Sequence, residues 1–231
     1  MKTSKLSLLA LLPLLLVQIY AVMESQTWLS SLSGLLLFFP LLHGFCCEVK
    51  KSRLNFRAFV ITAVLAGIFG FFQHKIGHFG MMVFSGISYL FLYLEALKFT
   101  ERSAANRYIK IVFVILVILN VYFLVGHLEE LKRKISDMGE MIFYVFYYLN
   151  LLVMALIALV YYLNSYSKKS VYFISLTLAL LFADVFRDMA LFYLPDASVE
   201  VIQAILRMAG LFMAFKFFTT SEKKLRLINL V

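Results

Sequence analysis

The stretch Leu181-Phe-Ala-Asp184-Val-Phe-Arg187-Asp188-Met-Ala190 places three ionisable residues inside a segment that is otherwise mainly apolar, from residue 171 to residue 194. Asp184, Arg187 and Asp188 are spaced i, i+3 and i+4, so on a helix all three side chains share one face. Charged side chains are energetically unfavourable in a bilayer and almost always face a bundle interior or a polar cavity. The pattern therefore predicts a membrane-spanning helix whose charged face points inward.

The composition of the whole chain is that of a polytopic membrane protein. Of its 231 residues, 63% are hydrophobic and only 15% are charged, whereas soluble domains are about half apolar and about a quarter charged. Eight helices of about 20 residues would use about 160 positions and leave only short loops. The predicted fold class is all-α: an integral membrane protein in which residues 1–231 form a single bundle of eight transmembrane helices.

Eight apolar segments, separated by polar or charged stretches, give the predicted helices. The first follows Lys2 and Lys5, which also suits a signal peptide, but no small-x-small cleavage site follows and we expect a retained helix. Pro40 predicts a kink in the second helix. The predicted helices cover residues 6–22, 28–45, 58–72, 79–97, 109–125, 141–163, 171–194 and 199–218.

The basic residues are concentrated in alternate loops. The N-terminus, the loops near residues 50, 102 and 168, and the C-terminus are basic, whereas the other loops are not, except for a mixed-charge loop near residue 133. The positive-inside rule then places both termini in the cytoplasm, and we expect the inner (plasma) membrane of a bacterium. The formal charge of +9 therefore reflects topology, and no nucleic-acid partner is predicted.

Depth estimates bring polar residues of several helices into one layer. At a rise of about 1.5 Å per residue, Asp184 lies about 15 Å from the outer end of its helix. Arg207 and Gln203 reach a similar depth on the last helix, and Tyr147 and Asn150 do so on the sixth. These residues predict a polar pocket in the outer half of the bundle, in which Arg207 balances the aspartates. A purely structural ion-pair network is the alternative.

Two groups of histidines are weaker candidates. His74 and His78 have the i, i+4 spacing of helical metal ligands, but we expect them in a glycine-containing loop without a third ligand. His127 is expected on the solvated face of the loop that follows the fifth predicted helix. The sequence contains no phosphate-binding loop, nucleophile elbow or zinc-protease motif. No metal and no cofactor are therefore predicted.

Short motifs in several helices resemble those of a known family. The chain reads Leu180-Leu-Phe-Ala-Asp184 and later Met208-Ala-Gly210-Leu-Phe, and it also contains Gly70-Phe71 followed by Phe84-Ser-Gly86-Ile-Ser-Tyr89. This pattern resembles the YhhN family, eight-helix membrane proteins that include lysoplasmalogenases. The chain departs from the family in three places. Phe71 stands where the family has an aspartate, Leu92 or a neighbour replaces a histidine, and no Lys-Pro precedes the second helix.

The resemblance implies acid-catalysed hydrolysis of the vinyl-ether bond of a lysoplasmalogen. Asp184 would be the general acid and Asp188 the second carboxyl group, with Arg187 or Arg207 holding the phosphate. Gln203, Asn150 and Tyr147 complete the predicted substrate-binding residues, and the expected partner is a membrane lipid or lysolipid-like amphiphile. Two other functions stay open. The first is a non-catalytic amphiphile-binding protein, suggested by Phe71, and the second is a proton-coupled carrier that uses Asp184 and Arg207 as a relay.

Overall fold

The computed structural model describes residues 9–48, 54–72, 74–100, 107–135, 137–165 and 167–222, and these parts of the chain are helical with short connections. The predicted basic segments at the two termini and near residues 50 and 102 lie largely outside the described residues. The described helices are α2 (Leu11–Met23), α3 (Thr27–Leu36), α4 (Phe38–Glu48), α5 (Leu54–Phe71), α6 (Lys75–Leu97), α7 (Arg107–Lys132), α8 (Met138–Ser165), α9 (Lys168–Phe192) and α10 (Ala197–Thr219).

Six of these helices, α5 to α10, are long and apolar enough to cross a membrane. The predicted second helix is instead divided into α3 and α4, with Leu37 between them. Pro40 explains the break, because its ring clashes with the carbonyl of Leu36 and it has no N–H to donate to that carbonyl. The described part of α2 spans only 13 residues. The all-helical membrane class is thus confirmed, and six of the eight predicted spans have sufficient length.

Two helix boundaries differ from the prediction in ways that matter for the site. α7 continues to Lys132 and therefore contains His127, which was expected in a loop. α6 begins at Lys75, with His74 as its N-cap residue, so His78 lies in the first helical turn. The loop predictions for His78 and His127 were wrong because a helix can continue into polar residues beyond its apolar part. In hydropathy such a polar helix end looks the same as a loop.

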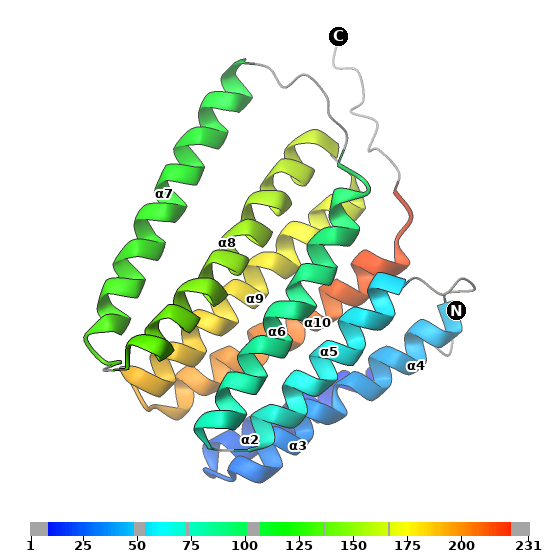
Figure 1. The fold of residues 1–231 in the computed structure, drawn as a ribbon. Helices are drawn as coiled ribbons and strands as arrows, with labels where there is room; N and C mark the ends of the chain where they lie inside the picture. The colour runs from blue at the N-terminus through cyan, green and yellow to red at the C-terminus, as the bar shows by residue number, and fades with distance from the viewer. Residues whose placement is uncertain are drawn as a thin grey trace.

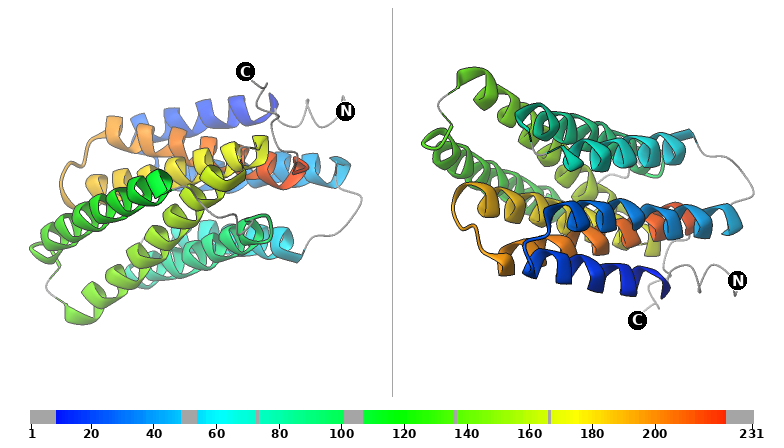
Figure 2. Two further views of the ribbon diagram at one scale, coloured as in Figure 1. Left: turned by 90° about the horizontal axis from the view of Figure 1, so that it is seen from above. Right: turned by 90° about the horizontal axis from the view of Figure 1, so that it is seen from below.

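Most long helices that follow one another in the chain are antiparallel neighbours, namely α5 and α6, α7 and α8, α8 and α9, and α9 and α10, whereas α6 and α8 pack side by side in the same direction (Figure 1). α9 packs along α10, α5 packs along α6, and α2 with α3 lies beside α10 and α5. The short connection between α9 and α10 makes them antiparallel neighbours. One end of the bundle, here called the Pro195 end, carries the connections near residues 25, 73, 135 and 195. The opposite end, called the Ser167 end, carries those near residues 50, 100 and 166 (Figures 1 and 2).

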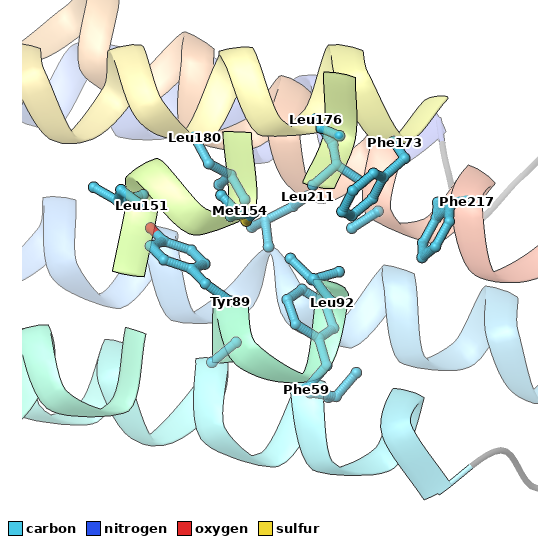
Figure 3. Close-up of a cluster of buried hydrophobic side chains, with 14 of the residues drawn as sticks. Phe59, Tyr89, Leu92, Leu151, Met154, Phe173, Leu176, Leu180, Leu211 and Phe217 are labelled. Carbon is cyan, nitrogen blue, oxygen red and sulfur yellow. The ribbon is translucent and has the colours of Figure 1, made fainter. Parts of the chain in front are cut away.

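The centre of the bundle is apolar where α6, α8, α9 and α10 meet. Tyr89, Met154, Leu180 and Leu211 converge there (Figure 3). Gly210 permits the close approach of α10 to α9, because a Cβ atom at this position would lie 2.8 Å from Cδ2 of Leu180. The Ala-Gly step quoted from the sequence therefore has a packing role between the two helices.

Candidate functional site: a buried ionic cluster beside a polar cavity

The three charged residues of α9 form a buried cluster. Asp184, Arg187 and Asp188 are 4%, 8% and 0% exposed, respectively. Nη1 of Arg187 lies 2.9 Å from Oδ1 of Asp184, and Nε lies 3.1 Å from Oδ1 of Asp188. One guanidinium thus bridges both carboxylates of its own helix, which confirms that the three residues share one inward-facing side.

Tyrosines of α6 and α8 complete the hydrogen bonding of both aspartates. The hydroxyl groups of Tyr89 and Tyr147 donate to Oδ2 of Asp184 at 2.8 and 2.7 Å. Tyr148 donates in the same way to Oδ2 of Asp188. Tyr147 was a predicted site residue, whereas Tyr89 and Tyr148 were not assigned to the site. Their only signal in the sequence was the richness of these helices in tyrosine.

Two histidines extend this network towards the Pro195 end. Nε2 of His127 lies 3.9 Å from Oδ2 of Asp188, and its ring meets that of Tyr148 edge-on at 4.8 Å between centroids. The expectation of a solvated loop face at His127 was therefore wrong. His78 forms a hydrogen bond of 2.7 Å with the hydroxyl of Tyr144, so its ring is already engaged within the bundle.

Arg207 does not balance the aspartates, contrary to the prediction. In the part of the chain that the structure describes, it forms no ion pair with a carboxylate. Arg187 takes both carboxylates instead, because it lies within one helical turn of each. Arg207 lines a separate cavity on the other side of Tyr89. The predicted layer is therefore divided, because Tyr147 of α8 joins the aspartates of α9 while Arg207 and Gln203 of α10 line the separate cavity.

This cavity, called the α10 cavity, has a volume of about 190 Å³ and lies among α2, α3, α5, α6 and α10. Glu200, Gln203 and Arg207 stand at i, i+3 and i+7 on α10, so they share one face of that helix. Oε1 of Gln18 is buried and has no hydrogen-bond partner among the described residues. The polar residues that line the cavity are Gln18, Ser30, Ser31, Glu200, Gln203 and Arg207.

The α10 cavity adjoins two neighbouring spaces, because some residues line both it and each of them. A space of about 230 Å³ shares Ser30, Ser31 and Glu200 with it and reaches the α2–α3 turn at the Pro195 end. A narrow space of about 20 Å³ shares Arg207 with it and is lined by Tyr89. Arg207 thus lies between the α10 cavity and a small space lined by Tyr89, whose hydroxyl contacts Asp184. The aspartates themselves do not line these spaces.

The remaining predicted residues lie apart from both features. Nδ2 of Asn150 donates to the backbone carbonyl of Gly86 at 2.8 Å, which ties α8 to α6. Phe71 is 39% exposed near the end of α5, while its neighbour Gly70 lines the α10 cavity. The position at which the resembling family has an aspartate is therefore next to the cavity, and it carries an apolar side chain here.

No family model, curated protein or solved structure matches this chain. The likeness to the YhhN family thus rests on the short motifs quoted from the sequence.

Proposed function

We propose that this protein binds the head group of a lysolipid-like amphiphile in the α10 cavity. The observation that carries the proposal is Arg207, a cation that lines a polar cavity and has no carboxylate partner among the described residues. A guanidinium is the side chain best suited to a phosphate, because its donors match two phosphate oxygens at once. The predicted topology would place the cavity mouth at the outer surface.

The order of charges along α10 suits a zwitterionic head group. Seven residues separate Glu200 from Arg207, which corresponds to about 10 Å along the helix. Arg207 is the deeper of the two and is suited to phosphate, while Glu200 near the mouth is suited to an amine. Gln203 lies between them and offers both a donor and an acceptor. A head group with one phosphate and one ammonium group would satisfy both charges.

Hydrolysis of a vinyl-ether lysolipid is the second candidate, and the contact between Tyr89 and Asp184 favours it. In this reaction an acid protonates the vinyl carbon, water attacks the resulting oxocarbenium ion, and the hemiacetal separates into an aldehyde and an alcohol. Asp184, however, accepts hydrogen bonds from two phenols and a guanidinium, whereas a general acid must donate a proton. This geometry supports binding more strongly than catalysis.

Binding can be tested with purified protein in lipid nanodiscs and lysophosphatidylethanolamine as the probe. Calorimetry should show that Arg207→Gln weakens binding at least tenfold, which is about 1.4 kcal/mol. Glu200→Gln should weaken binding of this probe but not of lysophosphatidic acid, which has no amine. Arg133→Gln, an exposed change outside the cavity, should leave both affinities unchanged. Equal binding by the Arg207→Gln variant would refute the head-group assignment.

Release of fatty aldehyde from an alkenyl lysolipid tests the second candidate in the same preparations. Turnover that is lost in Asp184→Asn would support catalysis. Binding without turnover would identify a non-catalytic protein. In that case, the appearance of turnover in Phe71→Asp would support the loss of a carboxyl group from an ancestral active site.

A further inference from the structure

A second space lies on another side of the ionic cluster, between α7, α8 and α9. It has a volume of about 120 Å³ and shares no lining residue with the α10 cavity. Its wall is mostly apolar, with three polar side chains, one amide, one imidazole and one phenol. The lining residues of this α7 cleft are Asn120, Phe123, Leu124, His127, Tyr148, Leu151, Leu152, Leu181 and Val185.

The α7 cleft is accessible from the lipid phase. α7 stands at the edge of the bundle next to α8 (Figures 1 and 2). Only 6% of the most apolar 18-residue segment of α7 is buried inside the protein. This is the lowest share among the six long helices that the structure describes. An amphiphile dissolved in the bilayer could therefore enter beside α7 without crossing the packed core.

The polar end of the cleft lies directly against Asp188. Tyr148 donates its hydroxyl to this carboxylate, and His127 lies 3.9 Å from it. Nε2 of His127 is buried and has no hydrogen-bond partner in the part of the chain that the structure describes. The cleft therefore ends in polar atoms that the protein leaves partly unsatisfied.

The cluster behind this polar end has an excess of negative charge. Its two carboxylates share the single guanidinium of Arg187, and Arg207 lines the α10 cavity instead. His127 lies 3.9 Å from Asp188 and adds a positive charge only when it is protonated, so with a neutral imidazole the cluster carries one unbalanced negative charge. An excess charge in a medium of low dielectric acts strongly on nearby groups. A cation at the end of the cleft would be attracted, and an anion would be repelled.

We propose that the α7 cleft is a second ligand site that binds a lipophilic monocation, with an alkyl chain along the apolar wall and a positive head at the Tyr148–His127 end. The aromatic rings of Tyr148 and Phe123 also favour a cation by their negative faces. This site is independent of the head-group site in the α10 cavity, because the two spaces lie on different sides of the cluster.

Three probes of equal chain length test the charge preference in zwitterionic nanodiscs: dodecyltrimethylammonium, dodecanol and dodecyl sulfate. After subtraction of uptake by empty nanodiscs, the cation should bind at least tenfold more tightly than dodecanol, and the sulfate more weakly than dodecanol. Asp188→Asn should reduce the preference for the cation over dodecanol to less than threefold. Asn120→Phe, which fills the cleft away from the ionic cluster, should weaken binding of the cation at least tenfold.

Arg207→Gln is the control and should leave cation binding unchanged. Loss of cation binding in this control would place the probe in the α10 cavity and overturn the proposal. Equal binding of all three probes would also overturn it, because the cleft would then receive only a chain. If Asp188→Asn does not fold, Asn120→Phe still decides, since undiminished binding by that variant would exclude the cleft.

Discussion

Replacing Arg187 with glutamine should destabilise the protein by about 3–5 kcal/mol, the range expected when one partner of a buried ion pair is removed. The guanidinium holds both Asp184 and Asp188, and none of the three residues is more than 8% exposed. Without Arg187, two carboxylates would remain buried, and their nearby donors among the described residues would be tyrosine hydroxyls and the His127 imidazole. Unfolding by sodium dodecyl sulfate in mixed micelles measures the change in the free energy of unfolding.

A triple variant separates charge from packing. Arg187→Gln combined with Asp184→Asn and Asp188→Asn removes all three charges and keeps polar groups of similar size, so it should recover most of the lost stability. Arg133→Gln, an exposed change near the Pro195 end, should stay within about 0.5 kcal/mol of the wild type. A loss below about 1 kcal/mol for Arg187→Gln alone would mean that water solvates the cluster, and would refute its description as a buried network. A triple variant no more stable than the single one would refute the role assigned to charge.

Four further changes test packing, helix capping and hydrogen bonding within the bundle. Gly77→Ala should unfold the protein or destabilise it by more than about 3 kcal/mol, because its Cβ would lie 2.0 Å from the carbonyl oxygen of Phe72. Gly126→Ala, where a Cβ meets nothing within 4 Å, should instead stabilise α7 by up to about 1 kcal/mol; thermal unfolding of the two variants compares them directly. Ser167→Ala removes the N-cap of α9, whose side chain accepts from the third backbone N–H, and should reduce the free energy of unfolding by about 1 kcal/mol. Tyr147→Phe should reduce it by about 1.5–3 kcal/mol, the usual range for a hydrogen bond to a charged group; an unchanged value in either unfolding assay would mean that the bond contributes nothing.

The sequence predicts the long helices well because a membrane span requires a long apolar run. It places their ends less well. The helix of α7 continues through the charged turn to Lys132, since charged side chains are compatible with a helix at the membrane surface. The division of the second span at Leu37 is a local effect of Pro40. The proline predicted a kink there, but hydropathy across this apolar segment gave no sign that the helix ends.

For the candidate site, the sequence predicts only those features that follow from the geometry of a single helix. The shared face of Asp184, Arg187 and Asp188 follows from their spacing, and the depth of Tyr147 follows from the helical rise. The direction of a side chain around the bundle depends on how neighbouring helices are rotated, which spacing within one helix does not determine. Arg207 lines the α10 cavity and forms no ion pair with the aspartates among the described residues. Tyr89 contacts Asp184 from the fourth predicted helix, to which the sequence assigned no site residue.

The separation of Arg207 from the cluster is the reason why the two proposed sites are expected to prefer different ligands. Two arginines paired with two aspartates would have formed a neutral layer with no charge left for a ligand. The single charge of Arg187 instead balances only one of the two carboxylates that it contacts. Arg207 supplies a positive charge to the α10 cavity. The excess negative charge faces the α7 cleft through Tyr148. The two proposals therefore share one cause: the pairing of Arg187 with both aspartates leaves Arg207 for the phosphate proposed in the α10 cavity and a negative charge for the cation proposed in the α7 cleft.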